Sequence, residues 1–97
     1  MYIYLMESKR DYDTVYKIGH SKSPNKRINC IQTGNDGDVK VLYTFFSKHG
    51  TSIENAMHKF YSHFHKNMEW FDLDLESVQN FLPMCEKIER NLDFLKP

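Results

Sequence analysis

Two short runs of β-forming residues stand close together at the start of the chain, and they limit what it can fold into. Residues 2–6 (YIYLM) and 15–19 (VYKIG) flank the polar segment 7–13 (ESKRDYD). Such runs on both sides of a polar segment are typical of a β-hairpin, here with a long connection. A third strand is expected at 39–46, and one of its faces should carry Val39, Val41, Tyr43 and Phe45.

Two helices are expected in the middle of the chain. Ser23 and Pro24 provide an N-cap and a first helical residue, so the first helix should run to about Thr33. Thr51 opens the second helix after a loop. Its buried stripe should comprise Ile53, Met57, Phe60, Tyr61 and Phe64.

The C-terminal third of the chain is expected to be mostly helical. Glu69–Phe71 is a short extended element that should return to the sheet. Apolar residues then recur every three or four positions from 75 to 95, and Pro83 predicts a kink or break near Leu82. The element order β-β-α-β-α-(β)-α predicts one α+β domain, residues 1–97, with a small sheet flanked by helices.

The charges of the chain balance in number but not in position. The 97 residues include 13 Lys and Arg and 13 Asp and Glu, so the formal net charge is zero. Residues 1–66 carry ten basic and six acidic residues and all five histidines, whereas residues 67–97 carry three basic and seven acidic ones. A basic N-terminal part can still offer a positive surface to a polyanion.

Neither a membrane span nor a secretion signal is indicated. No apolar run approaches the roughly 18 residues of a membrane span, and the first residues lack a basic n-region. Cys30 and Cys85 have no CxxC companion, so we expect two reduced and mostly buried thiols. These features predict an intracellular protein that is not secreted and does not contact a membrane.

Four residues of complementary chemistry suggest a phosphodiester hydrolysis site. The hairpin would place Tyr4 and Lys17 on neighbouring strands, where an ammonium beside a phenol favours the phenolate that can take a proton from water. Arg27, on the first predicted helix, can bind phosphate oxygens bidentately. Glu54 can hold a hard divalent cation, and His58 follows it by one helical turn.

The residues that carry this chemistry resemble the signature of the GIY-YIG nuclease superfamily, in its phage- and virus-encoded branch. That branch has the pattern YxY…YKIGxSxxPxxR…QTGN…ExxxHxxF…EWF. The matching residues here are Tyr2–Tyr4, Tyr16–Gly19, Ser21, Pro24, Arg27, Gln32–Asn35, Glu54, His58, Tyr61 and Glu69–Phe71. The resemblance covers about residues 1–73 and leaves 74–97 as a C-terminal helical region.

The resemblance implies a hydrolase with a three-stranded antiparallel sheet flanked by helices, which cleaves DNA strands with one divalent ion, Mg²⁺ or Mn²⁺. Tyr4 then corresponds to the proposed water-activating tyrosine, Arg27 to the arginine on the scissile phosphate, and Glu54 to the metal ligand. A viral or phage source implied by the resemblance would place the protein in the cytoplasm or the host nucleus.

Two positions depart from the family pattern. Tyr2 stands where the first signature has glycine, which should change packing rather than chemistry. Lys17 stands where the second signature has tyrosine, as in some restriction-type relatives, and Tyr16 moves to the opposite face of the strand. The late asparagine of several relatives has no clear equivalent. His20, His58 and Tyr16 are taken as auxiliary residues near the site.

Each candidate also has a structural interpretation. Thr51 and Glu54 have the spacing of a capping box, in which Glu54 would bond the backbone of Thr51. By itself Arg27 is typical of a solvated helix residue, and Lys17 of a strand-edge residue. Zinc binding is not favoured, because no Cys or acid completes a ligand set around His58, His63 and His65.

A set of lysines and an arginine is expected to surround the site and to give salt-sensitive binding without base specificity. The set comprises Lys9, Arg10, Lys22, Lys26, Lys48, Lys59 and Lys66. We therefore expect a metal-dependent DNA endonuclease, and the alternative is a non-catalytic nucleic-acid-binding module on the same fold. A third interpretation is a protein–protein module that acts through the acidic C-terminal helix, whose apolar strip would also support a homo-oligomer.

Overall fold

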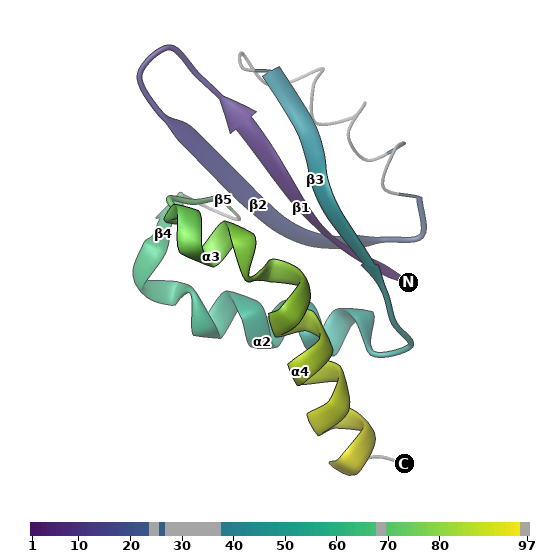
Figure 1. Ribbon diagram of the computed structural model, residues 1–97. Coiled ribbons are helices and arrows are strands. Elements are labelled where there is room, and N and C mark those ends of the chain that lie inside the picture. The colour runs from purple at the N-terminus through teal and green to yellow at the C-terminus, as the bar shows by residue number, and fades with distance from the viewer. Residues whose placement is uncertain (24–25, 27–37, 68–69, 96–97) are drawn as a thin grey trace.

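The strands form one antiparallel sheet in the computed structural model, which describes residues 1–23, 26, 38–67 and 70–95 (Figure 1). The five strands of this part of the chain have the order β3-β1-β2-β5-β4. Their bounds are Tyr2–Lys9 (β1), Thr14–Ser21 (β2), Asp38–Phe46 (β3), His65–Asn67 (β4) and Trp70–Phe71 (β5). The predicted α+β class is confirmed. The helix expected from Ser23 to about Thr33 falls almost entirely outside the described residues.

The sheet has two more strands than the family resemblance implies. β1, β2 and β3 are the long strands, and β1 lies between the other two. The predicted return of the chain to the sheet is confirmed for Trp70 and Phe71, which pair with Lys17 and Tyr16 of β2. β4 then pairs with β5. The two added strands are short and cover only part of β2.

The β1–β2 hairpin is longer than predicted and its connection is shorter. The strands pair from Tyr2, opposite Ser21, to Lys9, opposite Thr14. Only residues 10–13 connect them, and the Arg10 N–H donates a hydrogen bond to the Asp13 carbonyl at 2.8 Å. The polar end of β1 joins the sheet because ladder hydrogen bonds come from the backbone, whatever the polarity of the side chains.

β3 does not keep one side-chain alternation along its length, so the predicted common face of its four apolar residues is wrong. The register of β1 and β3 shifts between Leu5 and Met6, which leaves Leu42 as an extra residue in β3. A bulge of this kind exchanges the two faces of a strand. One face of β3 consequently packs Val39 and Val41, and the other packs Tyr43 and Phe45.

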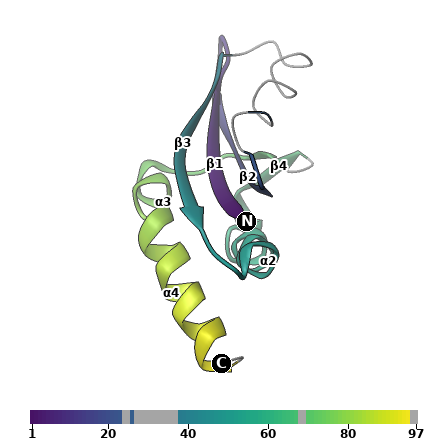
Figure 2. The ribbon, with the colours of Figure 1, turned by 90° about the vertical axis from the view of Figure 1, so that its right-hand side faces the viewer.

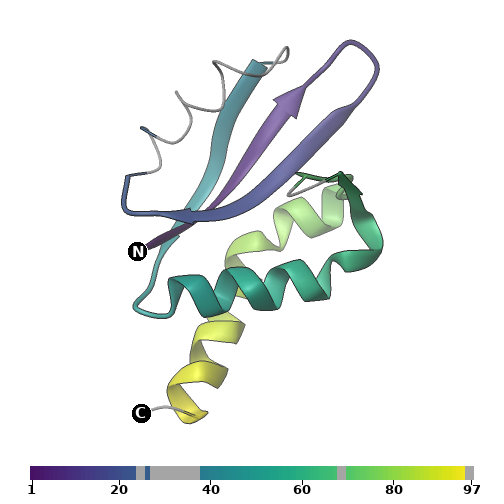
Figure 3. The same cartoon turned by 180° about the vertical axis from the view of Figure 1, so that it is seen from behind.

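Within the described residues, three helices pack against one face of the sheet and form the main core with it (Figures 1 and 2). Their bounds are Gly50–Phe60 (α2), Leu75–Gln79 (α3) and Phe81–Leu95 (α4), with a 3₁₀ turn, η1, at Ser62–Phe64. Seen from behind, α4 continues past the sheet to the C-terminus (Figure 3). The main core comprises Ile3, Leu5, Ile18, Ile53, Met57, Tyr61, Phe71, Leu73, Val78, Phe81 and Cys85. None of the helices in the described part is long and apolar enough to span a bilayer.

Part of the predicted stripe on α2 is wrong. Ile53 and Met57 are fully buried and Tyr61 is nearly so, as expected. Phe60, however, is 56% exposed, because it ends the helix on the side turned away from the core. Phe64 is half-buried, and it belongs to η1 rather than to the helix.

The predicted break in the C-terminal helical region is confirmed close to its expected place. α3 begins after Asp74, whose carboxylate accepts a hydrogen bond from the Ser77 N–H at 2.8 Å. The break falls at Asn80, and Pro83 lies in the first turn of α4. Proline fits there because the first N–H groups of a helix have no partner within the helix.

Cys85 is fully buried beside Met57, and burial raises the pKa of its thiol to about 12. At pH 8 only about one thiol in ten thousand is then ionised, and the thiolate is the reactive form. We expect a Cys30→Ser variant to resist iodoacetamide at pH 8 when folded and to react fully in guanidinium, as measured by intact mass. Equal alkylation rates in the two states would contradict this burial.

Candidate functional site

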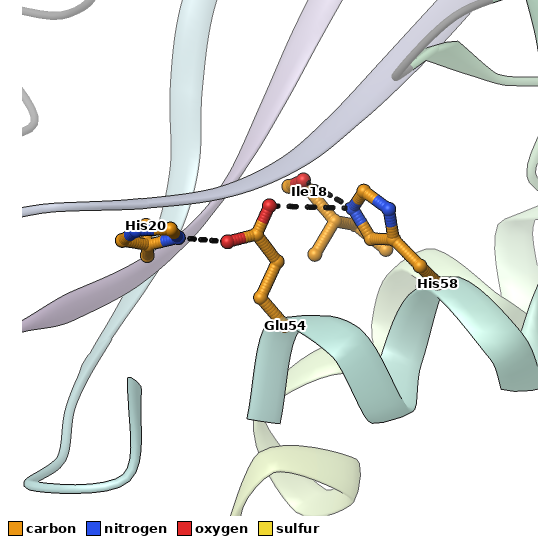
Figure 4. A network of polar contacts seen from close by, with 4 residues as sticks. All are labelled: Ile18, His20, Glu54 and His58. Carbon is orange, nitrogen blue, oxygen red and sulfur yellow. Dashed lines mark hydrogen bonds and ion pairs between the residues drawn. The ribbon is translucent and has the colours of Figure 1, made fainter. Parts of the chain in front are cut away.

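Glu54 is a buried carboxylate that faces the sheet from α2. The residue is only 9% exposed. α2 has His49 as its N-cap residue and makes no side-chain capping hydrogen bond. Thr51 therefore lies inside the helix, and the capping box that its spacing with Glu54 suggests is not formed. The carboxylate lies between two histidines instead (Figure 4).

His20 holds one oxygen of this carboxylate. It lies on β2 opposite Ile3, on the face that the helices cover, and its Nδ1 contacts Oε2 of Glu54. An ionised carboxylate can only accept a hydrogen bond, so Nδ1 carries the proton in this contact. The side chain of His20 is 36% exposed and that of Glu54 is 11% exposed, so the imidazole lies between the carboxylate and solvent.

His58 lies one turn after Glu54 and holds both the carboxylate and the sheet. Its Nε2 donates a hydrogen bond to the Ile18 carbonyl at 2.7 Å and lies 3.6 Å from Oε1 of Glu54. β5 pairs with β2 only at residues 16 and 17, so Ile18 lies just beyond the pairing on this side of β2. The ring also meets Phe71 edge-on, with centroids 5.1 Å apart. These contacts fix the imidazole beside the carboxylate.

Tyr4 packs directly onto Gly19. The two residues are opposite each other in the β1–β2 register, and the tyrosine is 1% exposed. A Cβ built on Gly19 would lie 2.6 Å from Cζ of Tyr4 and closer still to Oη. Only a residue without a side chain leaves room for the phenol there. The motif placed both residues near the site, but their direct contact was not anticipated from the sequence.

Lys17 shares a sheet face with Tyr4. It lies opposite Met6, two residues from Tyr4, and side chains two apart on one strand point the same way. It is 7% exposed, and its Nζ lies 5.9 Å from the centroid of the Trp70 ring, within range of a cation–π contact. The sequence-based expectation that the hairpin turns Tyr4 and Lys17 to one side therefore agrees with the register.

Tyr16 and Arg27 differ in how far the structure describes them. Tyr16 is half-buried in the main core, on the helix-covered face. Burial raises the pKa of its phenol, and the charges of Glu7 and Asp72 raise it further, so it is a poor proton donor at neutral pH. Arg27 lies outside the described residues.

The candidate residues thus converge on one stretch of β2 from two sides. His20, Glu54 and His58 meet on the helix-covered face, whereas Tyr4 and Lys17 lie on the opposite face. The Gly19 backbone separates the phenol from the carboxylate cluster. The pairing of His20 with Glu54, 34 residues apart, could not be seen in the sequence, where His20 was only a neighbour of the motif.

The predicted basic set does not surround this stretch as a whole. Lys9 and Arg10 lie at the hairpin turn, about 17 Å along the strand from Gly19 at 3.3 Å per residue. Exposed Lys22 and Lys26 follow the near end of β2. The other three lysines lie on the helix side: Lys48 pairs with Asp93 of α4, Lys59 is exposed on α2, and Lys66 pairs with Asp13.

A metal ion at Glu54 would find one carboxylate and few other protein ligands. The described residues contain no group of three or more His, Cys, Asp or Glu side chains arranged to hold an ion. Mg²⁺ keeps several waters and is often held by one or two carboxylates together with substrate phosphate oxygens. A single buried carboxylate is therefore closer to the coordination that Mg²⁺ prefers than to the four protein ligands of a structural zinc site.

Comparison with known proteins gives one family. The family model of the T5orf172 domain matches residues 1–89, which includes every element of the site and most of α4. This domain is associated with nuclease-like domains. Searches of curated proteins and of solved structures gave no match.

Proposed function

Because the chain belongs to the T5orf172 domain family, we propose that it is a metal-dependent endonuclease that hydrolyses DNA phosphodiester bonds. The observation that carries the proposal is the environment of Glu54. A buried carboxylate is costly unless its oxygens have partners. Here Oε2 contacts Nδ1 of His20, and Oε1 lies 3.6 Å from Nε2 of His58, beside the part of β2 that β5 does not pair with.

Glu54 is the proposed ligand of one Mg²⁺ or Mn²⁺ ion. Such an ion, when bound, would polarise the phosphate and stabilise the charge of the departing oxygen. His20 positions the carboxylate through its contact with Oε2, and His58, whose Nε2 donates to the Ile18 carbonyl, lies beside Oε1.

Tyr4 is the proposed group that takes a proton from the attacking water. Lys17 lies on the same face of the sheet, two residues from Gly19, which is opposite Tyr4, and is proposed to assist it. Arg27 is proposed to bind the scissile phosphate bidentately, in keeping with its place in the GIY-YIG pattern. The roles of Tyr4, Lys17 and Arg27 rest on the order of these residues along the chain and on the resemblance.

One observation favours the alternative of a non-catalytic nucleic-acid-binding module. Tyr4 is 1% exposed and its hydroxyl packs onto Gly19, so a substrate has little access to the phenol in this structure. A chain that kept this fold for binding alone would hold DNA through the lysines at the end of β2. Its affinity would then fall with rising salt as counterions are released, and no strand would be cut.

Metal removal separates the two functions. We expect the purified chain to convert supercoiled plasmid to open circles with Mg²⁺ or Mn²⁺, to stop when EDTA is added, and to resume when the metal is restored in excess. The conversion is followed on agarose gels at low salt. Salt-sensitive DNA binding without cleavage of plasmid, single-stranded or branched DNA in either metal would overturn the nuclease and leave the binding module.

A further inference from the structure

Two large aromatic side chains stand exposed at the end of the sheet next to the candidate site. Tyr2 is 37% exposed and Phe46 is 65% exposed. They lie opposite each other on β1 and β3, and their rings meet edge-on with centroids 5.2 Å apart and an angle of 67°. An aromatic pair of this size in water invites an explanation beyond the stability of the sheet.

This aromatic pair lies on the same sheet face as Tyr4 and next to it. Tyr4 is two residues from Tyr2 along β1, which is roughly 7 Å at the rise of a β-strand. Ser21 lies opposite Tyr2 and Gly19 lies opposite Tyr4, so the two pairs form neighbouring rows across the hairpin. A ligand bound at the end of the sheet on the Tyr4 face would therefore lie over the aromatic pair.

The surroundings of the pair fit a nucleotide better than a protein. Among the described residues, Ser21 and Thr44 border the rings with polar side chains on this face. Exposed Lys22 and Lys26 follow directly at the end of β2. Exposed rings beside positive charges are the usual means of binding single-stranded nucleic acid, in which the rings stack on bases and the charges contact phosphates.

We propose that Tyr2 and Phe46 form a stacking platform for an unpaired base next to the bond that is cut. The inference rests on the proposed nuclease function and adds its substrate class: DNA with a single-stranded segment at the cleavage point. A base inside a duplex is already stacked on its neighbours and cannot offer its face to the rings. The platform therefore distinguishes single-stranded from fully paired DNA without reading sequence.

Binding is measured in the Glu54→Gln background with EDTA, so that no cleavage intervenes, by fluorescence anisotropy of a labelled single-stranded 20-mer and of its blunt duplex. Phe46→Leu, which keeps apolar bulk but removes the ring, should weaken single-strand binding at least about fivefold and change duplex binding less than twofold. Phe46→Tyr should restore it. Tyr12→Leu is the matched control, since Tyr12 is fully exposed at the distant hairpin turn.

A base analogue locates the contact. With 2-aminopurine placed in turn along the single strand, its fluorescence should change on binding to the Phe46 protein and not to the Phe46→Leu protein. Equal weakening of single-strand and duplex binding, or none in Phe46→Leu, overturns the platform. The platform is also overturned if the wild type self-associates, Phe46→Leu abolishes this self-association, and DNA binding is unchanged. That result would assign the aromatic pair to contacts between protein molecules.

The same variants distinguish a failure of the platform proposal from a failure of the nuclease proposal. If metal-dependent cleavage is unchanged in Phe46→Leu and shows no preference for single-stranded sites, only the platform is overturned. Single-strand binding that depends on the ring at position 46, in a wild type that cuts no DNA, upholds the platform and overturns the nuclease.

Discussion

Replacing Glu54 with glutamine is expected to lower the rate of DNA cleavage at least about a hundredfold and to leave the fold intact. The amide has the size of the carboxylate but no charge, so it binds a hard divalent cation much more weakly, and the stabilisation of transition-state charge by such an ion is worth several kcal/mol. Its carbonyl oxygen can still accept the hydrogen bond from His20. The measurement is single-turnover cleavage in Mg²⁺ and Mn²⁺, with circular dichroism to verify folding.

The matched control for this variant is Glu86→Gln. Glu86 is an exposed carboxylate on α4, away from β2, and its neutralisation should change the rate less than twofold. Restoration of activity to Glu54→Gln by more metal would still agree with a weakened metal ligand. Full activity of Glu54→Gln at limiting metal would rule out Glu54 as that ligand.

Replacing Gly19 with alanine is expected both to destabilise the protein and to disable it. The added methyl would overlap the phenol ring of Tyr4, which is itself packed with Met6 and Val39 and cannot swing away freely. Overpacking of this kind costs about 1–3 kcal/mol of the free energy of unfolding. Cleavage should fall further than the folded fraction does, because the hydroxyl of Tyr4 is displaced from the Gly19 backbone.

Gly50→Ala provides the comparison. Its new Cβ would lie 2.8 Å from Cγ and 2.9 Å from Cβ of Met1, so Met1 must shift to admit it. Alanine favours the helix that begins there, which offsets part of this cost, and no aromatic ring is displaced, so we expect a smaller loss of stability than in Gly19→Ala. Urea unfolding and cleavage rates of the two variants are measured side by side. If Gly19→Ala were as stable and as active as Gly50→Ala, the packing of the Tyr4 phenol against Gly19 would be shown to matter neither for stability nor for cleavage.

The elements that local patterns specify were predictable from the sequence, and the contacts between distant segments were not. The hairpin, α2 and the break before Pro83 each follow from side-chain chemistry within a few residues. The bulge at Leu42 does not, because it depends on how β3 fits β1, and it reverses the faces expected for half of β3.

The site shows the same division. Its place in the motif predicts Glu54 as a metal ligand, while its spacing from Thr51 alone favours a helix cap. Only the packing of α2 on the sheet brings the carboxylate to His20, 34 residues away. Charge alone predicts that the basic residues lie together around the site. The register of the hairpin instead places Lys9 and Arg10 at the hairpin turn, at the far end of β2 from Gly19.

The hydrogen bond from His58 to the Ile18 carbonyl also bears on the edge of the sheet. A strand edge with free backbone groups can recruit a strand from another molecule, and within the described residues β5 pairs with β2 only at Tyr16 and Lys17. The imidazole occupies a backbone acceptor just beyond that pairing. One side chain thus lies beside the candidate metal ligand and satisfies an acceptor that an added strand would need.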